Sequence, residues 1–311
     1  MKYIAVLMST YNGETYLKEQ IDSILEQSGV KVELFIRDDG SKDGTTRIIK
    51  EYELLHKNVH WINQDCVCNL GVKESFLNTL RYAYEKCPEI EYFSFADQDD
   101  VWLSQKLQAG IAKISGSKNY KGALYYSNKI VVDEKLHEIE KEYINYYGDM
   151  LEILWKSLAS GCTFVFNRRL ADYVLKCNTD LNCLHDVWVY KLAKCIGSDV
   201  VFDTDRYMFY RQHSNNVCGE NHLVDFSITH FWDTFKRRLK PREHVVQKTI
   251  AEIYRLAGND ICEEAEGLDK IILNYNKSLK YKLKLLFFEG IEKRSFKLRL
   301  MWMEKVLFHV L

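Results

Sequence analysis

The chain has 311 residues, of which 47% are hydrophobic and 28% are charged, and its formal net charge is −1. This length and apolar content support one large domain, or one domain with an appendage, built around a full core. The near-neutral charge excludes the overall basic excess that is typical of nucleic-acid-binding proteins.

Nine cysteines occur at irregular spacings, in odd number and without a CxxC pair. These spacings do not match a zinc site or a disulfide framework, so we interpret them as free thiols in a reducing cytoplasm. Met1–Met8 is too short to be a signal peptide, and no apolar run reaches the roughly 18 residues of a membrane-spanning helix. The sequence therefore predicts a cytoplasmic protein.

The first hundred residues alternate between apolar runs and segments with helical periodicity. Strands are predicted at Ile4–Met8, Val32–Ile36, Val59–Ile62 and Tyr92–Phe95. Between them, apolar residues recur at helical spacing around residues 16–25, 48–52 and 76–84. This order predicts an α/β fold with a mostly parallel sheet and helices on both of its faces.

The rest of the chain divides into two parts. Further strands are predicted at Ala123–Tyr126, Cys162–Phe166, Val200–Phe202 and Tyr207–Tyr210, and a helix at His185–Gly197. From about Leu223 onward helical periodicity dominates and strand patterns vanish. We predict a first domain at residues 1–222 and a helical region at 223–311.

Polar residues follow three of the predicted strands, directly after Met8, Ile36 and Phe95. Ligands of parallel sheets bind at the carboxyl ends of the strands, so three polar clusters at one edge predict a binding site. A single cluster of this kind would indicate no more than a turn, because polar turns commonly follow strands.

The third cluster is the most acidic. In "FADQDDVW" (Phe95–Trp102), Asp97, Asp99 and Asp100 lie within four positions. Carboxylates at this spacing repel one another unless a cation joins them, and Mg²⁺ or Mn²⁺ often binds such groups together with a substrate phosphate. A DxD pattern alone also occurs in solvated loops, but here apolar residues enclose it on both sides.

Four motifs together resemble the family 2 glycosyltransferases of the GT-A fold. They are "STYNGETYLKEQIDSILEQ" (Ser9–Gln27), "LFIRDDGSKDGT" (Leu34–Thr45), "NLGVKESF" (Asn69–Phe76) and "FADQDDVW". "HDVW" (His185–Trp188) and "YRQHSNNV" (Tyr210–Val217) are similar to the bacterial rhamnosyltransferases of rhamnan and cell-wall polysaccharide synthesis. The resemblance covers about residues 1–220 and implies a Rossmann-like GT-A domain that binds a nucleotide sugar.

The resemblance also implies roles for residues of the nucleotide site. Thr10 and Tyr11 match the loop that holds the base, with the Tyr11 ring stacked on it. Asp39 matches the aspartate that accepts the N–H of the base imide, and Asp38 lies beside it. Lys73 stands where a basic residue often faces the nucleotide. A β-turn at the two aspartates and an exposed helix lysine are the structural alternatives.

Metal binding and catalysis are implied for a second group of residues. Asp97 matches the acid that faces the ribose and the metal, Asp99 the direct metal ligand, and His213 a position that often completes the metal site. Asp186 matches the catalytic base of inverting transfer. A first-turn helix acid and a structural histidine are the alternative interpretations for Asp186 and His213.

Two smaller assignments complete the predicted site. Trp188 and Trp102 are assigned to the acceptor pocket, with a place in the core as the alternative. Arg211, Gln212, Asn215 and Asn216, which flank His213, suggest a polar loop over the diphosphate.

The last 35 residues are basic and amphipathic. Lys277–Leu311 carries nine basic and three acidic residues, a net charge of +6, with apolar residues interleaved. Such helices are typical of contact with an anionic membrane surface, which would place the protein peripherally on the inner face of the cell membrane. A helical hairpin packed on the first domain, or a homodimer interface, is the alternative.

Taken with the resemblance, these observations predict an inverting, metal-dependent glycosyltransferase. It would transfer L-rhamnose from dTDP-L-rhamnose to a lipid-linked cell-surface polysaccharide, with Mg²⁺ or Mn²⁺ as cofactor. Two alternatives stay open: a UDP-hexose donor, because uracil and thymine present the same imide edge, and a non-catalytic sugar- or nucleotide-binding partner subunit.

Overall fold

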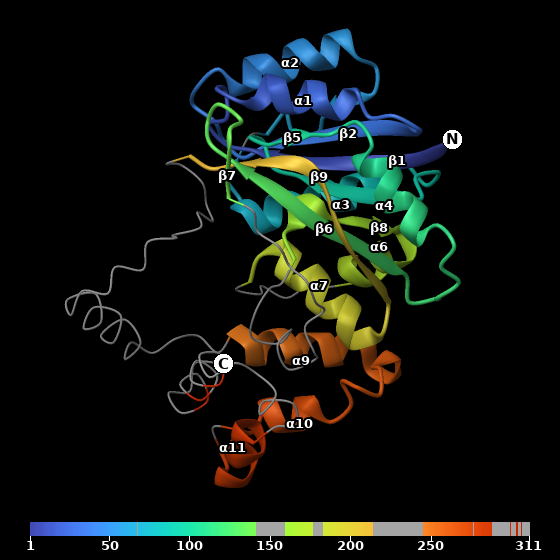
Figure 1. Ribbon diagram of the computed structural model, residues 1–311, viewed down its shortest axis with the longest axis vertical. Coiled ribbons are helices and arrows are strands. Elements are labelled where there is room, and N and C mark those ends of the chain that lie inside the picture. Colours follow the sequence, from blue (N-terminus) through green and yellow to red (C-terminus); the bar gives the residue numbers. More distant parts are fainter. Residues whose placement is uncertain are drawn as a thin grey trace, which may run out of the picture.

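Figure 1 shows a computed structural model of the chain. The structure describes residues 1–66, 68–140, 159–176, 183–213, 245–275 and 277–287, together with residues 299, 303 and 306. The predicted domain boundary at residues 222 and 223 lies outside the described residues, as do Asn215 and Asn216 and most of the basic segment after Phe287.

Four parallel strands form the first half of the central sheet, in the order β3-β2-β1-β4. Side chains of β1 alternate between two cores: Ala5 and Leu7 face one, and Ile4, Val6 and Met8 face the other. This period of two, with apolar residues at every position, is what a strand covered on both faces requires. The strands are β1 (Lys2–Thr10), β2 (Val30–Asp38), β3 (Val59–Trp61) and β4 (Tyr92–Ala96).

The second half of the sheet is mixed. Next to β4 the order continues β8-β6-β9-β5, with β6 and β9 parallel and the other pairs antiparallel. A short strand, β7 (Glu138–Glu140), pairs with β6 at the side. The other strands are β5 (Val101–Trp102), β6 (Ala123–Val132), β8 (Val165–Asn167) and β9 (Asp199–Arg211).

Two sequence-based strand predictions are corrected. Val200–Phe202 and Tyr207–Tyr210 are parts of one strand, β9, because a register shift opposite Ser127 and Asn128 carries the strand through its polar middle. The predicted strand at Cys162–Phe166 begins instead as a 3₁₀ turn, Gly161–Thr163, and only then enters β8.

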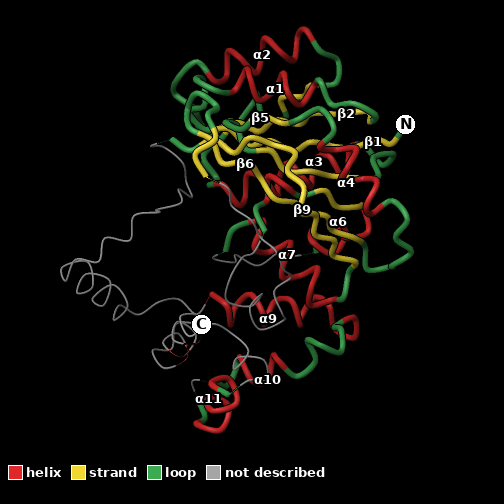
Figure 2. The backbone as a smooth tube through the Cα atoms, in the orientation of Figure 1, coloured by secondary structure: helices red, strands yellow, loops and turns green. Residues whose placement is uncertain are grey.

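Helices cover both faces of the sheet, as Figures 1 and 2 show. One face packs against α1 (Leu17–Leu25), α2 (Thr45–Leu55) and α4 (Lys106–Ile114). The other packs against α3 (Val72–Lys86), α6 (Arg168–Leu175) and α7 (His185–Ile196). The last of these ends at Gly197, whose φ of +73° closes the helix in the left-handed conformation.

The C-terminal helices lie on the far side of α7 (Figure 1). Ile250 and Ile253 of α9 (Val245–Ala257) are buried in the core that contains α7, and the Cys262 N–H donates to the Cys195 carbonyl at 2.9 Å. Beyond α9 come a 3₁₀ turn (Gly258–Asp260), α10 (Leu268–Ile272) and α11 (Leu279–Leu286). The predicted fold class, a mostly parallel α/β sheet with a C-terminal helical region, is confirmed. Among the described residues, no helix combines the length and apolar character needed to cross a bilayer.

Candidate active site

The three polar clusters meet at one edge of the sheet. Thr10 at the end of β1 is in register with Asp38 at the end of β2, and Met8 is in register with Ala96 at the end of β4. Parallel strands therefore deliver the residues that follow them to one place. The Thr10 hydroxyl donates to Asp38 Oδ1 at 3.0 Å, so it joins two of these strand ends directly.

Gln98, the residue between Asp97 and Asp99, ties the predicted base loop to the acidic loop. Its Oε1 accepts from the Tyr11 N–H at 2.8 Å, and its Nε2 donates to the Tyr11 carbonyl at 3.1 Å. A Cβ at Gly13 would stand 2.3 Å from Gln98 Oε1, so this approach requires glycine. The Tyr11 side chain stays 49% exposed, which leaves a ring face free for stacking on a base.

Asp38 is a turn residue. It is fully buried, and its Oδ2 accepts from the backbone N–H groups of Gly40 and Ser41 at 3.1 and 2.9 Å. The Ser41 hydroxyl donates to Oδ1 at 2.5 Å. This arrangement is the Asx-turn chemistry that the sequence offered as an alternative to nucleotide contact.

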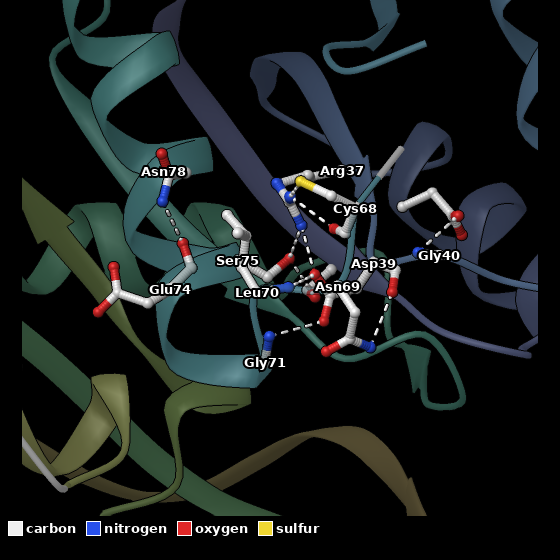
Figure 3. A network of polar contacts seen from close by, with 12 residues as sticks. Arg37, Asp39, Gly40, Cys68, Asn69, Leu70, Gly71, Glu74, Ser75 and Asn78 are labelled. Atoms are coloured by element: carbon white, nitrogen blue, oxygen red, sulfur yellow. Dashed lines mark hydrogen bonds and ion pairs between the residues drawn. The ribbon is translucent and has the colours of Figure 1, made fainter. Parts of the chain in front are cut away.

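Asp39 is the centre of a second network, shown in Figure 3. Its Oδ1 receives Arg37 Nη1 at 2.5 Å and the Leu70 N–H at 2.7 Å, and its Oδ2 receives the Gly71 N–H at 2.9 Å. The segment that precedes α3 is therefore held against the end of β2. Lys73, in the first turn of α3, is 14% exposed and pairs with Glu74 Oε1 at 3.0 Å.

The acidic loop after β4 is tightly enclosed. Ligand atoms of Asp97, Asp100 and Cys162 lie within 4.8 Å of one another. Burial, with the nearby charges of Asp99 and Asp186, raises the pKa of Asp97 to about 7. Burial, with the charges of Asp97 and Asp99, also raises the pKa of Asp100. Negative charge concentrated in this way favours a cation as partner.

His213 lies against Asp99. Its Nε2 is 2.8 Å from Asp99 Oδ2, both side chains are mostly buried, and its ring packs on Tyr16 at 5.1 Å. Arg211 does not cover a diphosphate. It is 2% exposed, donates from Nε to the Asp99 carbonyl at 2.8 Å, and pairs with Glu19, so it fixes the acidic loop from within.

Two lysines that the sequence reasoning missed face the acidic cluster. Lys106 is fully buried, with Nζ 3.5 Å above the Trp102 ring, and burial lowers its pKa to about 7 although Asp97 and Asp100 oppose that change. The positive charge of Lys129 lowers the pKa of both carboxyls. The sequence does not indicate that these lysines are near the acidic cluster, because lysine usually lies on the surface.

The residues present fit a hard divalent cation. Asp97 and Asp100 offer carboxylate oxygens close to one another, and Asp99, on the same loop, contacts the His213 imidazole. Carboxylate oxygens are the ligands that suit Mg²⁺ or Mn²⁺. Asp100 Oδ2 is buried and has no hydrogen-bond partner among the described residues, an unsatisfied polar atom that a nearby cation would satisfy. Which ion binds stays a prediction.

Asp186 begins α7 and is electrostatically coupled to the acidic loop, because its charge contributes to the raised pKa of Asp97. Its Oδ2 accepts from the Gly161 N–H at 3.2 Å and its Oδ1 from the Val187 N–H at 2.7 Å. A Cβ at Gly161 would stand 2.9 Å from both Asp186 Cβ and His185 Nε2, so glycine is needed for this approach. These two donors fix the carboxylate at the sheet edge.

His185, the residue before Asp186, packs between two phenylalanine rings. Its ring stacks on Phe76 at 4.0 Å and meets Phe95 edge-on at 4.6 Å. Burial lowers its pKa to about 4, although the Asp186 charge opposes the change, so the ring is neutral at physiological pH.

The two predicted acceptor tryptophans lie in the core. Trp188 is 1% exposed with its Nε1 donating to the Val174 carbonyl at 3.4 Å, and Trp102 is 3% exposed beneath Lys106. Neither indole presents a face to an acceptor, so this assignment is replaced by the core alternative.

Comparison with known proteins supports the class that this fold and site define. The family model described as glycosyl transferase family 2 matches residues 5–175, more than half of the chain. The chain belongs to glycosyl transferase family 2, as its motifs predicted.

The individual proteins that the chain resembles have low sequence identity to it. The chain is 28% identical over 226 residues to the dTDP-rhamnosyl transferase RfbG of Shigella flexneri, covering 69% of this chain and 74% of that one. The structure of S. aureus TarS 1–349 in complex with UDP-GlcNAc matches with a TM-score of 0.57 at 17% identity, covering 94% and 78% of the two chains. The mannosyltransferase PcManGT of Pyrobaculum calidifontis, in complex with GDP-Man and Mn²⁺, matches with a TM-score of 0.51 at 14% identity, covering 98% and 84%. Both solved structures support the GT-A fold.

Proposed function

We propose that this protein is an inverting, metal-dependent rhamnosyltransferase. It transfers L-rhamnose from dTDP-L-rhamnose to a lipid-linked cell-surface polysaccharide. The observation that carries this proposal is the proximity of Asp186 to the acidic loop. Asp186 accepts from the Gly161 N–H, the adjacent Cys162 thiol lies with the Asp97 and Asp100 carboxylates, and Asp99 of the same loop contacts His213. A metal-dependent inverting transferase needs a cation site for the diphosphate and a carboxylate base close to the same sugar.

The reaction is a single displacement at the anomeric carbon. The acceptor hydroxyl oxygen forms the new bond to that carbon while the bond to the diphosphate breaks, and the nucleoside diphosphate leaves with the electron pair. Asp186 takes the hydroxyl proton, held in place by the N–H groups of Gly161 and Val187. A divalent cation held by Asp97, Asp99 and His213 would neutralise charge on the departing diphosphate.

The nucleotide lies across the ends of β1 and β2 in this proposal. The exposed Tyr11 ring stacks on the base, Thr10 and Asp38 shape the turn beneath it, and Asp39 accepts the imide N–H. Lys73 reaches the diphosphate from the start of α3. Rhamnose as the sugar is supported by the similarity to RfbG and by the "HDVW" and "RQHSNN" motifs.

A UDP-hexose donor is the second candidate, and the UDP-GlcNAc complex of TarS supports it. The two candidates are separated by incubating the protein and Mn²⁺ or Mg²⁺ with dTDP-L-rhamnose, UDP-glucose or UDP-GlcNAc, and measuring release of the nucleoside diphosphate. We expect turnover with dTDP-L-rhamnose at least about tenfold above the UDP sugars. Preference for a UDP sugar would withdraw rhamnose, and binding of every nucleotide without turnover would favour a non-catalytic subunit.

We also propose that α11 contacts the inner face of the cell membrane, where a lipid-linked acceptor resides. Leu279, Leu283 and Phe287 are 72%, 43% and 81% exposed and recur every four residues, so they form one apolar stripe. Lys280 and Lys284 lie beside the stripe and are exposed. An apolar stripe flanked by lysines fits the boundary between anionic headgroups and acyl chains.

Vesicle sedimentation tests the membrane contact. We expect binding to vesicles that contain phosphatidylglycerol, weakened by salt, and weakened about tenfold or more by Leu283→Glu combined with Phe287→Glu. Leu54→Glu combined with Leu55→Glu is the control, because these leucines are also exposed, at 78% and 70%, but on α2 at the far side of the sheet. Equal binding by both double variants would refute the contact.

A further inference from the structure

Arg37, at the end of β2, forms a buried ion pair with Asp39. The Arg37 and Asp39 side chains are each 5% exposed, and their closest atoms are 2.5 Å apart. A buried pair of this kind is costly to desolvate, so it is weak evidence of a contribution to stability.

The pair fastens the segment Cys68–Gly71 to the sheet edge (Figure 3). Arg37 Nη2 donates to the Cys68 carbonyl at 2.9 Å, and the Asn69 side-chain amide donates to the Asp39 carbonyl at 2.9 Å. The N–H groups of Leu70 and Gly71 both point at the Asp39 carboxylate. Gly71, with φ of +79°, then turns the chain into α3.

The two Asp39 carboxylate oxygens accept different numbers of hydrogen bonds. Oδ1 accepts two donors, from Arg37 and Leu70, whereas Oδ2 accepts the Gly71 N–H. Each carboxylate oxygen offers about two lone-pair positions, so the remaining capacity lies on Oδ2. Asp39 can therefore accept a hydrogen bond from one further N–H group, but not from two adjacent N–H groups that would need one oxygen each.

We infer that Arg37 is a positioning residue that makes Asp39 a single-donor acceptor and holds segment 68–71 as a wall of the base pocket. The inference rests on the proposed function and deepens it by naming the base class. A pyrimidine imide presents one N–H between two carbonyls. Guanine presents two adjacent N–H groups that would need both carboxylate oxygens. Arg37 therefore selects a pyrimidine nucleoside diphosphate over GDP.

The test measures nucleotide affinity by calorimetry in the full chain with Mn²⁺. The wild-type protein should bind UDP and dTDP at least about tenfold more tightly than GDP. Arg37→Lys keeps a positive charge beside Asp39 but loses the planar fork, so UDP affinity should fall about tenfold with GDP affinity unchanged. The donor KM should rise while kcat stays within about twofold. Loss of stability alone would weaken all three nucleotides together.

Arg206→Lys is the control, because Arg206 pairs with Glu138 at 3.0 Å on β9, away from the nucleotide. A second measurement needs no change at Arg37. Cys68 and Cys66 are both exposed. Bound UDP should slow alkylation of Cys68 and leave the alkylation rate of Cys66 unchanged. Fragmentation of the peptide that contains both residues in the mass spectrometer distinguishes the two sites.

An Arg37→Lys protein that keeps the wild-type ratio of UDP to GDP affinity overturns the inference, and so does a Cys68 that UDP does not protect. A wild-type protein that binds no nucleotide refutes the proposed function itself. The two failures are therefore distinguishable.

Discussion

Replacement of Asp186 by Asn is expected to lower kcat about 10³-fold while nucleotide affinity stays unchanged. Asn keeps the size of the side chain, and its one carbonyl oxygen can still accept from either the Gly161 or the Val187 N–H group, which donate to different oxygens of Asp186. It cannot take the proton of the acceptor hydroxyl. The loss should therefore appear in the chemical step, measured as sugar transfer under saturating donor and acceptor.

The control for this variant is Asp172→Asn. Asp172 is also a helix carboxylate, on α6, but it is half exposed and pairs with Lys176 at 2.9 Å outside the site. Its replacement should leave transfer unaffected. Full activity in Asp186→Asn, with a folded protein, would remove Asp186 as the base and return it to the role of a first-turn helix acid.

Replacement of Asp99 by Ala is expected to abolish the metal-dependent part of nucleotide binding and to lower kcat/KM about 10³-fold. Asp99 contacts His213 and lies two residues from Asp97, so its loss removes one carboxylate of the predicted donor set and the contact that this carboxylate makes with the imidazole. Calorimetric titration of dTDP with and without Mn²⁺ measures the effect.

Asp133→Ala serves as the control, because Asp133 also pairs with a histidine, His137, at 3.2 Å but on an exposed turn. It should bind nucleotide and metal as the wild type does. His213→Ala should weaken metal affinity less than Asp99→Ala, since an imidazole contributes no net charge to the site when neutral. If metal stimulated dTDP binding equally in Asp99→Ala and wild type, the metal would have to bind elsewhere.

The parallel half of the fold was predictable because its information is local. Each strand from β1 to β4 is an apolar run, each is followed by a polar turn, and the apolar spacing changes to helical values between them. Strand β5, two residues long, was not predicted, because pairing with β9 more than a hundred positions later is what makes it a strand. Periodicity cannot reveal such a pair.

The same distinction applies to the site. Asp38, Asp39, Asp97 and Asp99 were placed correctly at the sheet edge, because the ends of parallel strands share that edge. Residues that act by reaching across to another loop were missed, since their partners are remote in sequence. The missed residues are Arg37, Gln98, Lys106, Lys129 and Gly161, which contact Cys68, Tyr11, Ser94, Ser160 and Asp186 respectively.

The predicted roles of Trp188 at the acceptor and of Arg211 over the diphosphate were wrong for a related reason. Both are common in binding sites, yet Trp188 fills the core behind α7 and Arg211 is buried under the acidic loop. The residue type determines which contacts a side chain can make, but its packing in the fold determines whether it is exposed to solvent.

Strand β9 has a consequence for how the site comes into being. Arg211 at its end donates to the Asp99 carbonyl, and His213 just beyond lies against the Asp99 side chain, contacts that join residues more than a hundred positions apart. Contacts of such sequence separation form late in folding, because a long loop must close first. During synthesis, the nascent chain can complete its sheet through β4 long before β9 leaves the ribosome. The acidic loop therefore acquires its histidine only near the end of the folding of this domain, and fragments that stop at residue 175, where the family match ends, would lack it.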